Sequence, residues 1–138
     1  MELEKQLIKK VIIPEVFDDC YLYFAQNPTH IPFKIKRIYF ITKPKTRLPR
    51  GYHAHLKNQQ VIFCIQGTIT LTLDNGRKRK KVLLNKPNEG VFLEKMVWHE
   101  MADFKKNTIL LILASGVFDE KDYIRNYEQF KKKVSQVS

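Results

Sequence analysis

The sequence predicts an all-β protein, an antiparallel barrel or jelly roll that carries one helix at its C-terminal end. Residues 69–73 alternate apolar side chains with threonines, and a period of two is typical of a strand with one buried face. The Asp74-Asn75-Gly76 sequence that follows favours a hairpin, because Asn and Gly tolerate positive φ. A chain of 138 residues fits a single domain, residues 1–138, with a core of its own.

Strands are expected through the N-terminal half of the chain. Residues 7–14, 20–25 and 35–42 are rich in β-branched and aromatic side chains, which favour extended structure. Asn27-Pro28 marks a loop between the second and third of these segments. Residues 43–49 form a basic loop with two prolines, which we expect to make a rim suited to an anion.

The C-terminal half completes the antiparallel set and then changes character. Residues 61–66 alternate up to a turn at Gly67, and residues 82–84, 91–93 and 108–114 are further apolar runs of strand length. Residues 119–134 instead place large apolar side chains at spacings of three and four, with acidic residues first and lysines last. This pattern predicts a helix over residues 119–134 that packs against the barrel.

The charge balance is the unusual bulk property. The chain has 25 Lys and Arg against 14 Asp and Glu, a net charge of +11, which favours an anionic partner. The basic runs at residues 77–81 and 131–133 contain no aromatic side chains of the kind that stack on bases. We therefore interpret the runs as solvated surface and expect no nucleic-acid partner. Lysines in the first run also discourage edge-to-edge pairing of an exposed strand.

Nothing in the sequence indicates a membrane or an oxidising compartment. No apolar run has the length of a membrane span, and the first residues lack the layout of a signal peptide. Two cysteines, Cys20 and Cys64, are too few for a disulfide framework. Cys64 lies within an apolar strand, and we interpret it as a buried, reduced thiol. We expect a cytoplasmic protein.

A His-x-His pair is the main candidate for chemistry, because alternate residues of a strand face the same side. His53 and His55 follow a glycine, as in the first motif of cupin barrels, which this segment resembles. In metal-binding cupins a Glu follows, and here that position holds Gln60. His99 lies where the third histidine ligand would be. Three imidazoles can hold a divalent metal. The exchange of Glu for Gln nevertheless removes the anionic ligand, so we expect no metal.

A narrower resemblance rests on a combination of motifs. The chain resembles the dTDP-sugar 3,4-ketoisomerases, cupin-fold enzymes of deoxysugar biosynthesis, in residues 31–39, 49–55, 98–101, 113–115 and 122–127. The resemblance implies isomerisation of dTDP-4-keto-6-deoxyglucose to a 3-keto sugar, with neither metal nor cofactor. It also implies a place in deoxyaminosugar synthesis for lipopolysaccharide or another surface glycan. A homodimer that exchanges the N-terminal strand is implied as well.

The family's catalytic residues have counterparts in this sequence. The resemblance places the catalytic histidine at His53, its neighbour at His55, the strand tyrosine at Tyr39 and the motif arginine at Arg50. An Arg-Gly segment that the family often has near its N-terminus is missing from residues 17–20. The chemistry agrees with these residues, because a histidine can accept and return a proton near neutral pH. Tyrosine can donate to an oxyanion, and arginine matches phosphate oxygens.

Three further residues are candidates for binding the substrate. His99 lies beside Trp98 and is expected to shape the pocket or to contact the sugar. Arg37 and Lys36 alternate along one strand, so only one of them can face the interior.

Two other classes of function stay open at this point. One is a metal-dependent cupin enzyme, either a dioxygenase or an isomerase, and the other is a cupin that binds an anionic carbohydrate without catalysis. Metal content distinguishes the first, and turnover of a nucleotide-linked 4-keto sugar distinguishes the second.

Overall fold

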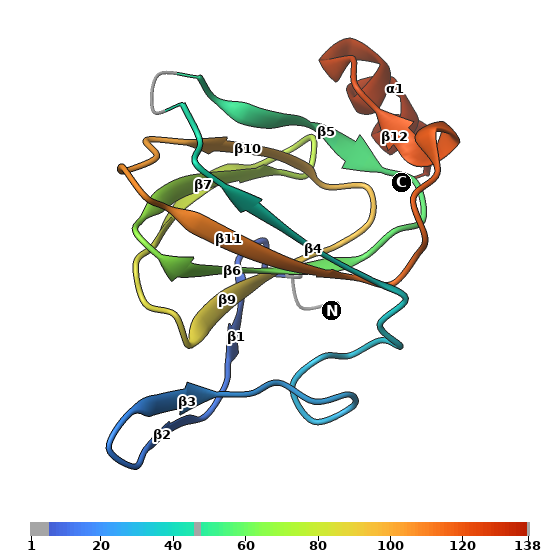
Figure 1. Cartoon of the computed structure of the whole chain (residues 1–138). Helices are drawn as coiled ribbons and strands as arrows, with labels where there is room; N and C mark the ends of the chain where they lie inside the picture. Colours follow the sequence, from blue (N-terminus) through green and yellow to red (C-terminus); the bar gives the residue numbers. More distant parts are fainter. Residues whose placement is uncertain (1–5, 46–47, 138) are drawn as a thin grey trace.

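The computed structural model describes residues 6–45 and 48–137, and it confirms the all-β, cupin-type prediction (Figure 1). One five-stranded sheet has the order β1 (Lys9–Ile12), β9 (Glu89–Leu93), β6 (Gln60–Gln66), β11 (Ile109–Ala114) and β4 (Arg37–Thr42). The other has the order β12 (Tyr123–Ile124), β5 (Arg50–His55), β10 (Trp98–Ala102), β7 (Ile69–Asp74) and β8 (Arg79–Leu84). The strand pairs in both sheets are antiparallel.

The alternation in the sequence produces the core between the two sheets. Ile69, Leu71 and Leu73 of β7 are fully buried, and they pack with the inward-facing Ile62, Leu110 and Ile112 of the opposite sheet. Burying side chains of this size removes their apolar surface from water, which stabilises each by about 1.5–3 kcal/mol. These apolar side chains form the core between the two sheets.

The predicted hairpin between β7 and β8 forms, and its turn is held by side chains. Gly76 has φ +92°, and its backbone N–H donates to the Asp74 carboxylate at 2.7 Å. The Asn75 side chain accepts from the N–H groups of Arg77 and Lys78. The strand that follows, β8, lies at the edge of its sheet with its basic residues exposed, in agreement with the interpretation of residues 77–81 as surface.

The start of the predicted helix was wrong. Asp119 caps a short 3₁₀ turn, Glu120–Asp122, and β12 then pairs with the end of β5. The α-helix α1 spans Tyr127–Val137. Asn126 accepts a hydrogen bond from the N–H of Gln129, as an N-cap residue does, so a capping signal at Asn126 was available in the sequence. Residues 123–124 form a strand because the open edge of β5 pairs with them, so the α-helix begins only after Asn126.

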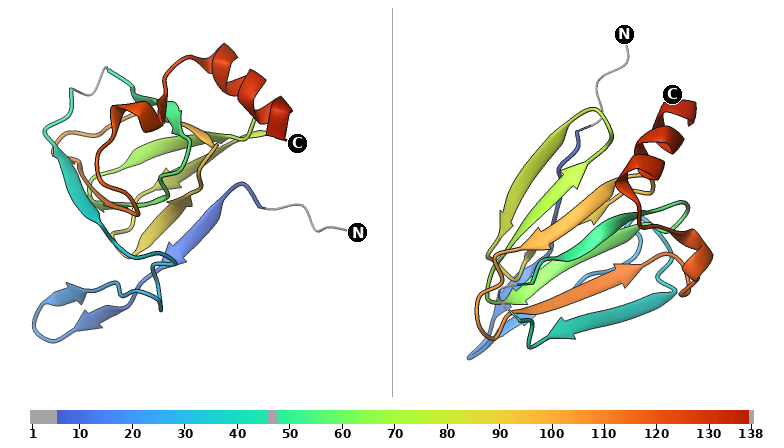
Figure 2. Two further views of the ribbon diagram at one scale, coloured as in Figure 1. Left: turned by 90° about the vertical axis from the view of Figure 1, so that its right-hand side faces the viewer. Right: turned by 90° about the horizontal axis from the view of Figure 1, so that it is seen from above.

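Helix α1 covers one end of the second sheet, as Figures 1 and 2 show. Phe130 is fully buried against Ala54, Trp98 and Ile124, and Val134 packs on the same cluster. No helix in residues 6–45 and 48–137 is long and apolar enough to cross a membrane.

The N-terminal segment pairs within its own chain in this structure. β1 pairs with β9 at four residue positions, whereas the resemblance implied that this strand is exchanged between the two copies of a dimer. The strands β2 (Glu15–Phe17) and β3 (Tyr21–Tyr23) then form a separate hairpin that projects away from the barrel (Figures 1 and 2). The hairpin exposes several large apolar side chains, namely Val16, Phe17, Tyr21 and Leu22.

Candidate active site

The first candidate histidine is positioned by an irregular segment of β5. Gly51 has φ +89°, and a Cβ atom there would lie 2.9 Å from the carbonyl oxygen of His99, so only glycine lets the two strands approach this closely. Beyond this point His53 pairs directly with His99 of β10. A backbone constraint in the sequence, the glycine before His53, therefore determines how β5 presents its histidines.

The three predicted histidines form one cluster. The ring centroids of His53 and His99 are 4.4 Å apart, and those of His53 and His55 are 5.0 Å apart. Tyr123 of β12 packs against both His53 and His55, at 4.9 and 4.5 Å. The cluster lies at the open side of the barrel, between β5, β10 and β12.

A cavity of about 380 Å³ opens beside this cluster. Its walls contain five of the predicted site residues, Arg37, Tyr39, Arg50, His53 and His99. Lys36 is exposed and does not line the cavity, because the alternation along this segment directs Arg37 inward instead. His55 lies behind His53 and is only 3% exposed. The cavity therefore presents one histidine of the His-x-His pair directly, with the other supporting it.

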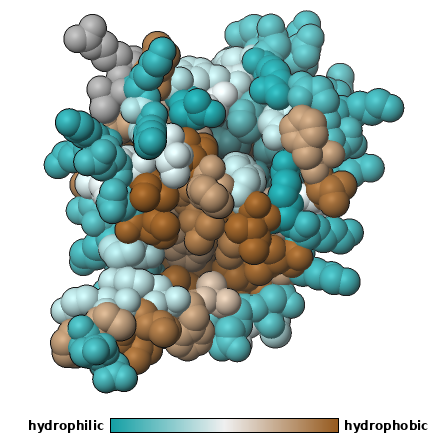
Figure 3. Space-filling model, in the orientation of Figure 1, coloured by the Kyte–Doolittle hydropathy of each residue, from teal (hydrophilic) through white to brown (hydrophobic). Residues whose placement is uncertain are grey.

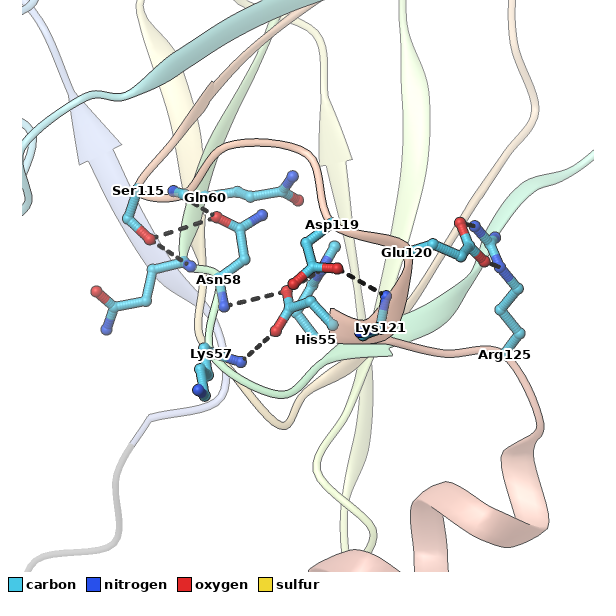
Figure 4. Close-up of polar contacts among 12 residues, drawn as sticks. His55, Lys57, Asn58, Gln60, Ser115, Asp119, Glu120, Lys121 and Arg125 are labelled. Atoms are coloured by element: carbon cyan, nitrogen blue, oxygen red, sulfur yellow. Dashed lines mark hydrogen bonds and ion pairs between the residues drawn. The ribbon is translucent and has the colours of Figure 1, made fainter.

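His55 is held by a carboxylate that the sequence analysis did not identify as a site residue. Its Nδ1 lies 2.9 Å from Oδ2 of Asp122, and its buried Nε2 has no hydrogen-bond partner among the residues that the structure describes. Asp122 also accepts from the backbone N–H groups of Lys57, at 2.7 Å, and Asn58, at 3.3 Å (Figure 4). A carboxylate acceptor at Nδ1 selects the tautomer whose Nε2 is free of hydrogen. The motif at residues 122–127 contained this signal, but the helix prediction placed it on the wrong element.

Burial keeps the histidines neutral. It lowers the pKa of His53 from 6.5 to about 4, with the neighbouring His55 adding to the effect. It also lowers the pKa of His55, although the hydrogen bond to Asp122 opposes the change. Burial and the charges of the other two rings hold the pKa of His99 well below its usual value. At neutral pH all three rings are therefore available as proton acceptors.

Tyr39 faces the same cavity from the opposite sheet. Its hydroxyl accepts a hydrogen bond from Nε2 of Gln60 at 2.7 Å. Burial raises the pKa of the Tyr39 phenol, and the hydrogen bond from Gln60 partly offsets that rise. The phenol is protonated at neutral pH and can act as a hydrogen-bond donor.

Arginines surround the opening of the cavity. The Arg37 guanidinium lies 5.2 Å from the centroid of the Tyr39 ring, and its buried Nε meets no hydrogen-bond partner among the residues described. Arg125 was not anticipated as a site residue. It stacks on Tyr123 at 4.3 Å and makes a two-bond ion pair with Glu120 (Figure 4). With Arg50, these groups make the cavity suited to an anionic ligand.

The histidine cluster is also the group in the described residues with the spacing of metal ligands. One nitrogen from each of His53, His55 and His99 lies within 4.8 Å of the others. Neutral imidazoles are suitable ligands for a divalent metal. The fourth position that would supply a carboxylate is Gln60, whose amide nitrogen is directed to Tyr39. The donor set is therefore three neutral rings with no anion.

Comparison with known proteins gives a consistent result. A family model described as FdtA: WxcM-like, C-terminal, matches residues 7–135. The chain is 42% identical over 117 residues to the TDP-4-oxo-6-deoxy-α-D-glucose-3,4-oxoisomerase of Aneurinibacillus thermoaerophilus, covering 85% of this chain and 84% of that protein.

Solved structures agree with this similarity. A 3,4-ketoisomerase from Helicobacter canadensis superposes with a TM-score of 0.90 at 39% identity, over 93% of this chain and 97% of that one. A mutant 3,4-ketoisomerase from Thermoanaerobacterium thermosaccharolyticum, in complex with TDP-4-keto-6-deoxyglucose, has a TM-score of 0.90 at 35% identity, over 94% and 95% of the two chains.

Proposed function

The chain belongs to the FdtA family, WxcM-like, C-terminal, and we propose that it is a TDP-sugar 3,4-ketoisomerase that converts TDP-4-keto-6-deoxyglucose into its 3-keto isomer. One observation carries the assignment of chemistry to residues. A neutral histidine, His53, and a protonated phenol, Tyr39, line the same cavity from opposite sheets, and arginines line that cavity as well.

The reaction moves a carbonyl by transferring two protons. A base removes the C3 proton, which the adjacent C4 carbonyl makes acidic, and an enediolate with negative charge on O4 results. The hydroxyl proton of O3 is then transferred to O4, and a proton returned to C4 leaves the carbonyl at C3. No atom or electron is gained or lost overall. We assign the carbon-bound proton to His53, which can accept it at C3 and return it at C4.

The other residues of the cavity stabilise charge and orient the substrate. Tyr39 donates a hydrogen bond to O4, where negative charge develops in the transition state. Arg37 and Arg50 bind the diphosphate, for which guanidinium groups are suited. The buried Nε of Arg37 has no hydrogen-bond partner in the described part of the chain, which supports a role in binding an anion. His99 packs beside His53 and limits the positions that its ring can take.

His55 supports His53 from behind the cavity. Its Nδ1 bond to Asp122 leaves an unprotonated Nε2 beside the ring of His53. A neutral second ring there keeps the surroundings of His53 low in positive charge, so that His53 remains free of its proton before the substrate binds.

The function is tested by incubating the protein with TDP-4-keto-6-deoxyglucose and following the sugar by NMR. We expect loss of the C4 ketone signals and appearance of a 3-keto product. A substrate that stays unchanged beside a folded protein that binds TDP would favour a carbohydrate-binding role instead.

We further propose that the protein is a homodimer. The outer face of β4 and β6 exposes Ile38, Phe40 and Ile65, and a groove of about 420 Å³ lies next to it. Figure 3 shows the apolar surface continuing across this side of the molecule, toward the β2–β3 hairpin. A groove and a projecting apolar hairpin on the same molecule are what a self-complementary, two-fold interface requires. In the proposed exchange, the β1–β9 pairing within one chain is replaced by the same pairing between two copies, and the hairpin of each copy lies against the apolar face of the other.

The cellular location and the biosynthetic role of the enzyme are proposed on separate grounds. We propose a cytoplasmic enzyme, a location supported by the free thiols of Cys20 and Cys64. The 3-keto sugar nucleotide that it forms has a ketone on which an amino group can be installed. This chemistry supports a role in making a deoxyaminosugar for lipopolysaccharide or another surface glycan.

A further inference from the structure

We propose that Gln60 is a positioning residue that sets the direction of the Tyr39 hydrogen bond, so that the phenol proton is presented to the substrate. This inference rests on the proposed function. Nε2 of Gln60 donates to the Tyr39 hydroxyl at 2.7 Å, and Gln60 is 1% exposed. Both residues line the cavity.

The contact is built into the sheet. Gln60 of β6 pairs with Ala114 of the intervening strand β11, and Tyr39 of β4 pairs with Ile112 on the other side of that strand. The two polar side chains therefore reach across β11 on its inner face. Ala114 has only a methyl group, which leaves space for them to meet diagonally above the strand.

The hydrogens on the two groups determine the direction of the Gln60–Tyr39 hydrogen bond. An amide NH₂ group can only donate, so the Tyr39 oxygen is the acceptor in the contact with Gln60. The single phenol proton remains available for a different acceptor. In a cavity closed on this side by the sheet, the sugar oxygen that carries the developing negative charge is that acceptor.

A glutamate at this position would have the opposite effect. A carboxylate can only accept, so the Tyr39 hydroxyl would donate its hydrogen bond to the glutamate and would no longer donate to the substrate. It would also place a negative charge beside an enediolate that is itself negative, which disfavours the transition state. The Gln60 amide therefore does more than leave a metal-ligand position without a carboxylate. It also keeps the Tyr39 proton available to the substrate.

The test compares kcat and KM for four proteins on TDP-4-keto-6-deoxyglucose: wild type, Gln60→Met, Tyr39→Phe and the double variant. Loss of an oxyanion donor in Tyr39→Phe is expected to lower kcat by about 10²-fold. Gln60→Met, which keeps the size and removes the donor, should lower kcat by about 10-fold, with KM changed by less than about 3-fold. In the Tyr39→Phe background the same substitution should change kcat by less than about 2-fold.

A second variant keeps the shape of the side chain. Gln60→Glu, assayed with a chelator because it would complete a metal ligand set, should lower kcat more than Gln60→Met does. Gln66→Met is the matched control, since Gln66 lies on the same strand but is exposed and donates to the carbonyl of Asn107. It should leave kcat unchanged. Melting temperature and TDP affinity show that each variant is folded.

Two outcomes would overturn the inference while the function stands. One is a Gln60→Met effect of equal size with and without the Tyr39 hydroxyl, and the other is a Gln60→Glu variant with near-normal kcat. A folded wild-type protein that does not turn over the sugar would instead contradict the proposed function itself.

Discussion

The Nδ1 atom of His55 and the Oδ2 atom of Asp122 lie 2.9 Å apart, although 67 positions separate the two residues in the sequence. The bond joins β5 to the turn that precedes β12, and it fixes the ring of a histidine whose Nε2 has no hydrogen-bond partner within residues 6–45 and 48–137. A carboxylate at this site determines both the orientation and the tautomer of the imidazole.

Asp122→Asn should therefore lower kcat by about 10-fold or more with little change in TDP affinity, because an amide can stabilise the wrong tautomer. Steady-state kinetics and calorimetric titration with TDP measure the two quantities. Asp119→Asn is the matched control, since Asp119 caps the same turn through Lys121 without touching a histidine. Equal kinetics for Asp122→Asn and wild type would show that His55 needs no carboxylate.

Replacing His53 with Asn should remove the base while keeping the fold and nucleotide binding. A general base contributes about 10²–10⁴-fold, so kcat should fall by at least the lower of these factors. Wild-type turnover in deuterium oxide should place deuterium in the product, detected by NMR, because the protonated histidine exchanges with solvent. His55→Asn should lower kcat less than His53→Asn does, and Tyr39→Phe should lower it less again. A nearly normal kcat for His53→Asn would move the base to His55.

Acidification should destabilise the folded protein. The pKa of His53 is lowered to about 4, below the value of 6.5 for an exposed ring, so the folded state binds fewer protons than the unfolded state between those pH values. The stability that the neutral ring supplies is fully present above pH 6.5 and is lost as the pH falls toward 4. The melting temperature should drop by about 5 °C or more between about pH 7 and pH 5.

His53→Asn should weaken this pH dependence, since Asn does not titrate. His30→Asn is the control, because His30 lies in a loop away from the cavity and should leave the slope as it is. A melting temperature independent of pH in wild type would contradict burial of neutral histidines.

Activity should not depend on a metal. Gln60 occupies the position of the anionic cupin ligand, and its amide nitrogen is committed to Tyr39. Protein purified without a chelator should hold far less than one equivalent of a transition metal by mass spectrometry, and EDTA should leave kcat unchanged. Stoichiometric iron, manganese or zinc together with inactivation by EDTA would support a metal-dependent enzyme.

The dimer should depend on the apolar face of the first sheet. Phe40 is 68% exposed in the single chain, and Phe40→Glu would place a charge in the proposed interface. We expect a dimer for wild type and a monomer for Phe40→Glu by light scattering at micromolar concentration. Leu83→Glu is the control, because Leu83 is 57% exposed on β8 of the other sheet. A wild-type monomer would rule out the proposed assembly.

Much of the fold could be predicted because its signals are local. The alternation in residues 69–73 and the turn at Asp74–Gly76 each depend on neighbouring residues, and both occur as expected. The signal that determines β12 is not local. Tyr123 shares a helical spacing with Tyr127, Phe130 and Val134, and the open edge of β5 determines that Tyr123 and Ile124 form a strand instead.

The sequence by itself indicated most of the strands, the presence of a C-terminal helix, the His53-x-His55 pair and the replacement of a glutamate by Gln60. It also established that only one of Arg37 and Lys36 can face the interior, since alternation follows from the geometry of the backbone. Only the tertiary structure decided which polar groups meet. Asp122 reaches His55 and Gln60 reaches Tyr39 because strands distant in sequence pair in a defined register. Burial of the histidines, and with it the lowered pKa of each ring, also arises only when the two sheets close over them.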